Sequence, residues 1–230
     1  MPAEPASLDQ LNPVEEWKPW DPDGKKHLGP KWVGHLYRRA AFGLTLEELH
    51  RSADETPAAV LDRLFAIDPD LAGEDSKLAQ KGIEAAAEND PYYLRGWWLD
   101  RMLSCGFPLR EKMTLFWHNH FATSIVKVQS ASLMLRQNEL MRRHALGKFG
   151  PMLQEMSKEP AMLIWLDSNS NVKGKANENY AREVMELFTL GVGNYTEKDV
   201  QEAARAFTGW HTNGAKSASG GSAFSLMKKR

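Results

Sequence analysis

The stretch Asn177-Glu178-Asn179-Tyr180-Ala181-Arg182-Glu183-Val184-Met185-Glu186-Leu187-Phe188-Thr189-Leu190-Gly191 predicts a helix whose two ends are both marked. Asn177 can accept hydrogen bonds from the first free backbone N–H groups, and Gly191 can adopt the left-handed conformation that ends a helix. One face carries apolar residues at helical spacing, namely Tyr180, Ala181, Val184, Leu187 and Phe188. We expect that face to be buried.

A second face of this helix is polar. It carries Asn179, Arg182, Glu183 and Glu186 at spacings of three and four residues, with Glu178 one turn before Arg182. Residues at these spacings are neighbours on a helix surface. The three carboxylates are either a solvated face or the wall of a functional site, and both interpretations stay open at this point.

The remaining sequence repeats the helical signals. Helices are predicted at 31–42, from 45, from 56, and at 76–88, 91–103, 108–121, 131–146, 151–157, 160–166 and 196–210. The helix at 91–103 is apolar around most of its circumference, so we expect it to lie centrally. No segment alternates apolar and polar residues with β-branched enrichment, which argues against a sheet. The sequence therefore predicts an all-α protein, an irregular multi-helix array.

Three regions are expected along the chain. Residues 1–30 are rich in Pro, Asp and Glu, which indicates an extended N-terminal arm carrying Trp17 and Trp20. Residues 31–212 form the helical domain. Residues 213–230 are Gly, Ser, Ala and Lys with few apolar side chains, so we expect a disordered C-terminal tail.

Composition excludes several function classes. The 230 residues carry a net charge of −1, which gives no general attraction to nucleic acid. No apolar run has the length of a membrane span, and the first ten residues lack a signal-peptide pattern, so we expect a cytoplasmic protein. The single cysteine, Cys105, excludes an internal disulfide and a zinc–thiolate cluster.

The segment Phe116-Trp117-His118-Asn119-His120-Phe121 holds two imidazoles. On a helix, residues two apart point in nearly opposite directions, so we expect His120 to face the core and His118 to face away from it. Imidazoles and carboxylates together form the mixed nitrogen and oxygen sites that hold iron, manganese or zinc. The predicted metal ligands are His118, His120, Glu178, Glu183 and Glu186. The predicted catalytic residues are Glu183, Glu186, His120 and Arg182, in a metal-dependent enzyme whose reaction is unknown.

A structural interpretation stands beside this one. Histidines among aromatic residues are commonly hydrogen-bonded core residues, and helical glutamates are commonly solvated. Arg142 and Arg143 can also pair with the carboxylate stripe in a buried ion-pair network. The alternative function is therefore a non-enzymatic scaffold, or a helical module that binds a partner through a structural Glu/Arg/His framework.

Five successive segments resemble landmarks of one family. They are His35-Leu36-Tyr37-Arg38-Arg39-Ala40-Ala41-Phe42-Gly43, Met113-Thr114-Leu115-Phe116-Trp117-His118-Asn119-His120-Phe121, Pro160-Ala161-Met162-Leu163 with Trp165-Leu166-Asp167, the 177–191 stretch, and Phe207-Thr208-Gly209-Trp210. Together they are similar, over roughly residues 35–210, to the large bacterial family called domain of unknown function eighteen hundred.

The resemblance implies a helical protein whose domain normally continues beyond the Phe-Thr-Gly-Trp segment. We therefore expect an incomplete domain here, such as a truncated or frameshifted gene product would give. Genes of the family often lie beside genes for secreted, sulfatase-like proteins, which implies a sulfatase-like partner and an association with the cell envelope. The family has no settled activity, so the resemblance assigns no catalytic residue.

Overall fold

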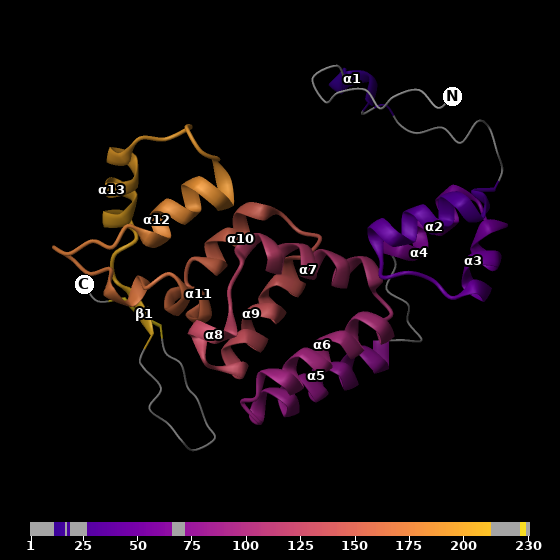
Figure 1. Cartoon of the computed structure of the whole chain (residues 1–230), viewed down its shortest axis with the longest axis horizontal. Coiled ribbons are helices and arrows are strands. Elements are labelled where there is room, and N and C mark those ends of the chain that lie inside the picture. Colours follow the sequence, from indigo (N-terminus) through magenta and orange to yellow (C-terminus); the bar gives the residue numbers. More distant parts are fainter. Residues whose placement is uncertain (1–11, 17, 19–26, 66–71, 213–225, 229–230) are drawn as a thin grey trace.

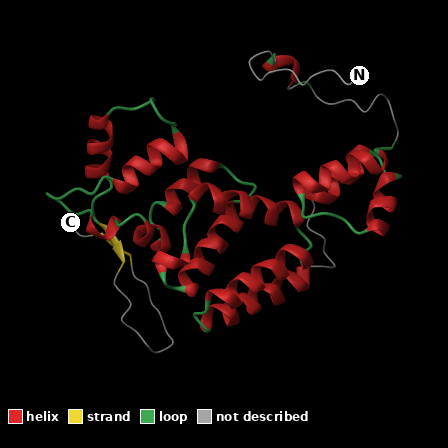
Figure 2. Ribbon diagram, viewed as in Figure 1, coloured by secondary structure: helices red, strands yellow, loops and turns green. Residues whose placement is uncertain are grey.

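The structure is a computed structural model that describes residues 12–16, 18, 27–65, 72–212 and 226–228, and its secondary structure within these residues is almost entirely helical (Figure 2). The predicted fold class is confirmed. The elements are α1 (Pro13–Glu16), α2 (Gly29–Ala40), α3 (Leu46–Ala53), α4 (Pro57–Phe65), α5 (Ala72–Ala87), α6 (Pro91–Ser104), α7 (Pro108–Phe121), α8 (Ile125–Val128), α9 (Ala131–His144), α10 (Phe149–Met156), α11 (Pro160–Trp165), η3 (Ser168–Ser170), α12 (Asn179–Glu183), η4 (Val184–Thr189), α13 (Glu197–Ala206), β1 (Trp210–Thr212) and β2 (Leu226–Lys228).

The helices follow one another across the molecule (Figure 1). Helices α2 to α4 bury a small apolar cluster of their own around Val33, Tyr37 and Val60. The largest cluster lies farther along the chain, where α7, α9, α10, α11, α12 and η4 meet. Its buried residues are Phe121, Leu140, Met141, Met152, Met156, Met162, Leu166, Tyr180 and Phe188. The predicted single domain at 31–212 stays a prediction.

Local capping signals fix several helix starts. The Thr45 hydroxyl accepts from the backbone N–H of Glu48 while the Glu48 carboxylate accepts from the Thr45 N–H, a capping box that opens α3. Thr196 and Asp199 form the same motif at α13. Because these hydrogen bonds satisfy N–H groups that have no partner inside the helix, a few residues define each boundary.

The predicted absence of a sheet is wrong. Strands β1 and β2 pair antiparallel, with Trp210 opposite Lys228 and Thr212 opposite Leu226. Residues 226–228 of the predicted disordered tail are therefore in a strand, and residues 213–225 and 229–230 lie outside the described residues. Three-residue strands are too short for a periodic pattern to reveal.

The predicted extended arm is also wrong in part. Residues 13–16 form the short helix α1, and α2 already begins at Gly29, before the predicted start at residue 31. Pro30 fits there because the first turn of a helix needs no internal hydrogen bond from its N–H. Trp17 and Trp20 lie outside the described residues.

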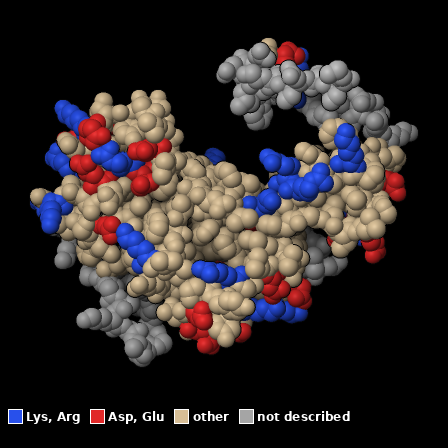
Figure 3. Space-filling view, in the orientation of Figure 1, with Lys and Arg blue, Asp and Glu red and all other residues tan. Residues whose placement is uncertain are grey.

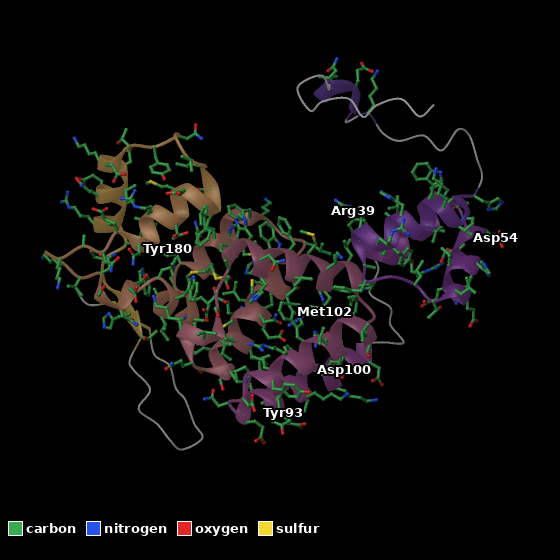
Figure 4. All side chains as sticks on the ribbon, in the orientation of Figure 1. Arg39, Asp54, Tyr93, Asp100, Met102 and Tyr180 are labelled. Atoms are coloured by element: carbon green, nitrogen blue, oxygen red, sulfur yellow. The ribbon has the colours of Figure 1, made fainter. Side chains whose placement is uncertain are left out.

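The apolar sequence of helix α6 predicted a central position, and this prediction is wrong. It packs beside α5 and also contacts α7 and α9, and Figure 4 labels its residues Tyr93, Asp100 and Met102. Trp97 and Arg101 are its buried side chains, whereas Tyr92 and Leu103 are 78% and 82% exposed. Because apolar residues occur around the whole helix, the sequence alone does not show which face is buried. In the fold, neighbouring helices cover the face that carries Trp97 and Arg101.

A buried ion-pair network joins α6, α7 and α9. Glu111, which is 0% exposed, accepts from Arg142 Nε at 2.8 Å and Nη2 at 2.7 Å, and from Arg101 Nε at 3.3 Å. Burial by itself raises the pKa of the Glu111 carboxyl. The hydrogen bonds and charge of Arg142, with Trp98 and Arg101, outweigh burial and hold that pKa below its usual value.

Candidate functional site

A groove of about 500 Å³ lies where the predicted polar helix meets the ends of α7 and α11. Three of the predicted polar residues, Asn179, Arg182 and Glu183, line one wall. The opposite side is formed by Phe121, Ala122, Lys127, Trp165, Leu166 and Asp167, and the groove is completed by Leu187 and Phe188. Part of the predicted polar stripe therefore lines a groove, and distant segments of the chain complete it.

The polar helix is an α-helix only as far as Glu183, after which residues 184–189 form a π-helix. The N–H groups of Leu190 and Gly191 both donate to the Met185 carbonyl, at 2.9 and 3.0 Å. Gly191 has a φ of +78°, as the predicted left-handed end requires, and the Asn177 side chain accepts from the Asn179 N–H at 2.9 Å. Short π-helical turns inside helices occur frequently at functional sites.

The π-helix corrects one prediction from the apolar stripe. Leu187 was expected in the core with Phe188, yet Leu187 is 59% exposed and lines the groove. A π-helix holds more residues per turn than an α-helix, so the side chains that follow Val184 are rotated relative to the predicted stripe. Tyr180, labelled on α12 in Figure 4, Ala181 and Phe188 are buried as predicted.

Glu183 is half-buried and has no hydrogen bond or ion pair within the described part of the chain. Burial, and after it the negative charge of Glu186, raise the pKa of the Glu183 carboxyl above its usual value. Glu186 itself accepts from the Tyr195 hydroxyl at 2.8 Å. Glu183 is therefore the carboxylate of the predicted stripe that is left available to another molecule.

The cations of the groove are already paired. Lys127 Nζ lies 2.8 Å from Asp167 Oδ2 and donates to the Trp165 carbonyl at 2.6 Å. Arg182 pairs with Glu178 at 3.1 Å and with Glu197 at 2.7 Å. Acidic and basic side chains are intermixed over α12 and α13 in Figure 3. Glu178 and Arg182 thus belong to a partly exposed cluster of ion pairs on the surface. For these two residues the structure agrees with the interpretation of the polar stripe as a solvated face.

The two histidines lie on different sides of α7, but both are half-buried, so His118 does not face away from the core as expected. His120 Nε2 lies 3.2 Å from the Phe188 carbonyl, among the rings of Phe121 and Phe188. His118 packs edge-on against Trp98, with ring centroids 5.0 Å apart, and burial lowers the pKa of its imidazole. His120 therefore supports the π-helix behind the groove, and neither imidazole is among the groove's lining residues.

The predicted metal ligands do not form a recognisable cluster. Among the described residues, which include all five of them, no group of three or more His, Cys, Asp or Glu side chains could hold a metal ion. The prediction of a metal site gains no support from this geometry.

Two positions in the groove wall have unusual backbone conformations. Ala122, which ends α7, and Asp167, which follows α11, have φ values of +46° and +56°. Residues other than glycine rarely adopt positive φ values, because their Cβ atom comes too close to the following carbonyl oxygen. Asn89 and Gln129, which do not line the groove, also have positive φ values, so this backbone feature is not confined to the groove wall.

The expected pairing of the carboxylate stripe with Arg142 or Arg143 is wrong. Arg142 is buried against Glu111 and Glu139, and Arg143 pairs with Glu155 at 3.5 Å. Sequence reasoning also missed Lys127 and Asp167 of the groove. They lie 40 residues apart in the sequence, so no local spacing connects them.

The described residues thus form an all-α protein with a groove that has both apolar and charged lining residues. The chain belongs to the family described as "Protein of unknown function (DUF1800)", whose model matches residues 35–230. The matched residues include all five landmark segments and continue past Trp210. Neither the comparison with curated proteins nor the comparison with solved structures found a match. None of the described helices has the length and apolar character needed to cross a membrane.

Proposed function

We propose that the chain is a ligand-binding helical module whose groove holds an organic cation, with Glu183 pairing with the positive charge. One observation carries the proposal. Lys127 and Arg182 each have carboxylate partners, whereas Glu183 has none within the described residues. A half-buried carboxylate without a partner favours a ligand that brings a positive charge or a hydrogen-bond donor.

The other lining residues indicate the body of the ligand. Trp165, Leu187 and Phe188 give the groove apolar walls beside Glu183. Aromatic and aliphatic walls with a few placed polar groups are typical of sites for small molecules. A primary amine joined to one aromatic ring matches both features, so benzylamine is a suitable probe.

Titration calorimetry with benzylamine tests the proposal, with uncharged benzyl alcohol as the comparison ligand. A charge-assisted hydrogen bond contributes about 1.5–3 kcal/mol, so Glu183→Gln should weaken benzylamine binding by roughly tenfold or more. Glu88→Gln is the matched control, because Glu88 is an exposed glutamate outside the groove. Binding should also weaken with added salt.

Equal affinity of wild type and Glu183→Gln for benzylamine would refute the proposal. So would benzyl alcohol binding as tightly as benzylamine, because the positive charge would then contribute nothing. Both variants should unfold at the same urea concentration as wild type, which separates lost binding from lost folding.

The metal-dependent enzyme predicted from the sequence has no comparable observation in its favour. Its direct test is the iron, manganese and zinc content of metal-replete protein, compared between wild type and Glu183→Ala. The sulfatase-like partner and the envelope location implied by the family resemblance stay predictions, because no contact among the described residues concerns them.

A further inference from the structure

A second cavity, separate from the groove, lies between the first half of α6, the start of α8 and α9. Its volume of about 190 Å³ exceeds the roughly 150 Å³ of an engineered protein cavity that binds benzene. Apolar walls are provided by Leu94, Trp97, Trp98, Ile125, Met134 and Leu135. The cavity therefore has the size and the walls for one aromatic ring.

The buried Glu111 network fixes two side chains of this cavity. Trp98 Nε1 donates to Glu111 Oε1 at 2.7 Å, which sets the plane of the indole. Arg142 Nη2 donates to Asn138 Oδ1 at 2.5 Å. Because a guanidinium only donates, the amide oxygen of Asn138 must face Arg142, and its NH₂ group is turned the other way.

The polar groups that remain are chiefly donors. Asn138 is 6% exposed, and its NH₂ group has no partner among the described residues. Arg95 also lines the cavity from the surface of α6, and its guanidinium has no ion pair within the described ranges. The ring nitrogens of His118 likewise have no hydrogen-bond partner in the described part of the chain. An amide donor and a free guanidinium beside an apolar cavity are complementary to a carboxylate.

We propose that this cavity binds a small aromatic carboxylate of the benzoate class, with the ring against Trp98 and the carboxylate held by Arg95 and Asn138. Because Trp98 and Asn138 are already fixed in orientation, these two side chains lose little conformational freedom on binding. This site differs from the Glu183 groove in the charge of its ligand. Benzoate and benzylamine therefore distinguish the two sites on one protein.

Titration of the full chain with benzoate, monitored by tryptophan fluorescence and by calorimetry, tests the proposal. Arg95→Gln should weaken benzoate binding by about tenfold or more, the loss of one charge-assisted hydrogen bond. Arg39→Gln on α2, labelled in Figure 4, is the control that should leave affinity unchanged. Ile125→Trp should abolish binding by filling the cavity, whereas Val126→Trp, at a neighbouring position that is 77% exposed, should not.

The result expected is saturable benzoate binding that depends on Arg95 and Ile125 but not on Glu183. Absence of saturable binding at millimolar benzoate would overturn the proposal. Retained affinity in Arg95→Gln would overturn the assignment of a carboxylate ligand. Loss of benzylamine binding in Glu183→Gln with benzoate binding intact would confirm that the two sites are independent.

Discussion

Replacing Glu111 by glutamine should destabilise the protein strongly. Glu111 accepts four hydrogen bonds, two from Arg142, one from Arg101 and one from Trp98. Removing one partner of a buried ion pair costs about 3–5 kcal/mol, because an uncompensated charge is left inside. Arg142 keeps Glu139 and Arg101 keeps Asp75, so we expect the lower end of this range, about 3 kcal/mol.

Urea unfolding followed by tryptophan fluorescence measures this cost. The control is Glu139→Gln, whose carboxylate also pairs with Arg142 but is 33% exposed, so its loss should cost less than about 1 kcal/mol. The pKa of Glu111 lies below its usual value, so its contribution is present above the usual pKa of a glutamate and is lost as pH falls through the lowered pKa. The difference between wild type and Glu111→Gln should therefore shrink in acid. A cost for Glu111→Gln no larger than that for Glu139→Gln would refute the reasoning.

Three further changes test other parts of the structure. Burial raises the pKa of Glu159 to about 7. The contribution of this residue to folding stability is therefore fully present below the usual pKa of a glutamate and is lost as pH rises through 7. Wild type should thus lose stability, on the order of 3 kcal/mol, between about pH 5 and about pH 8, and a Glu159→Gln variant that loses as much would contradict this. Gly82→Ala should destabilise by about 1–3 kcal/mol despite the helix propensity of alanine, because a Cβ there would lie 2.7 Å from the buried Trp97 ring; a higher urea midpoint would disprove the close packing. Ala122→Gly should raise stability by about 1 kcal/mol by relieving the positive φ, and a lower thermal midpoint would speak against strain at that position.

Signals that act within a few residues were predictable from the sequence. The capping boxes at Thr45 and Thr196 and the left-handed end at Gly191 all follow from hydrogen bonds and φ values inside one turn. The helix at 108–121 has the predicted bounds because Pro108 can open a helix and the chain turns left-handed after Phe121. Such features need no information about the rest of the fold.

Features that depend on distant segments were not predictable. The π-helix at 184–189 packs against α7, with His120 next to the Phe188 carbonyl, and the apolar spacing of the sequence indicated an ordinary helix. The exposed face of α6 arises because the fold covers one side of an apolar helix. Lys127 pairs with Asp167, so it does not pair with Glu183. These residues lie in distant segments of the chain, and no periodic pattern in the sequence indicates that they meet.

The central claim is that Glu183 is an available carboxylate that meets a cationic ligand. Carbon-13 NMR of glutamate-labelled protein, with Glu183→Gln to assign the resonance, measures the pKa of this group directly. We predict a pKa above the usual glutamate value in the free protein, and a fall in this pKa when benzylamine is added, because a nearby positive charge stabilises the carboxylate. An ordinary pKa that benzylamine leaves unchanged would contradict the claim.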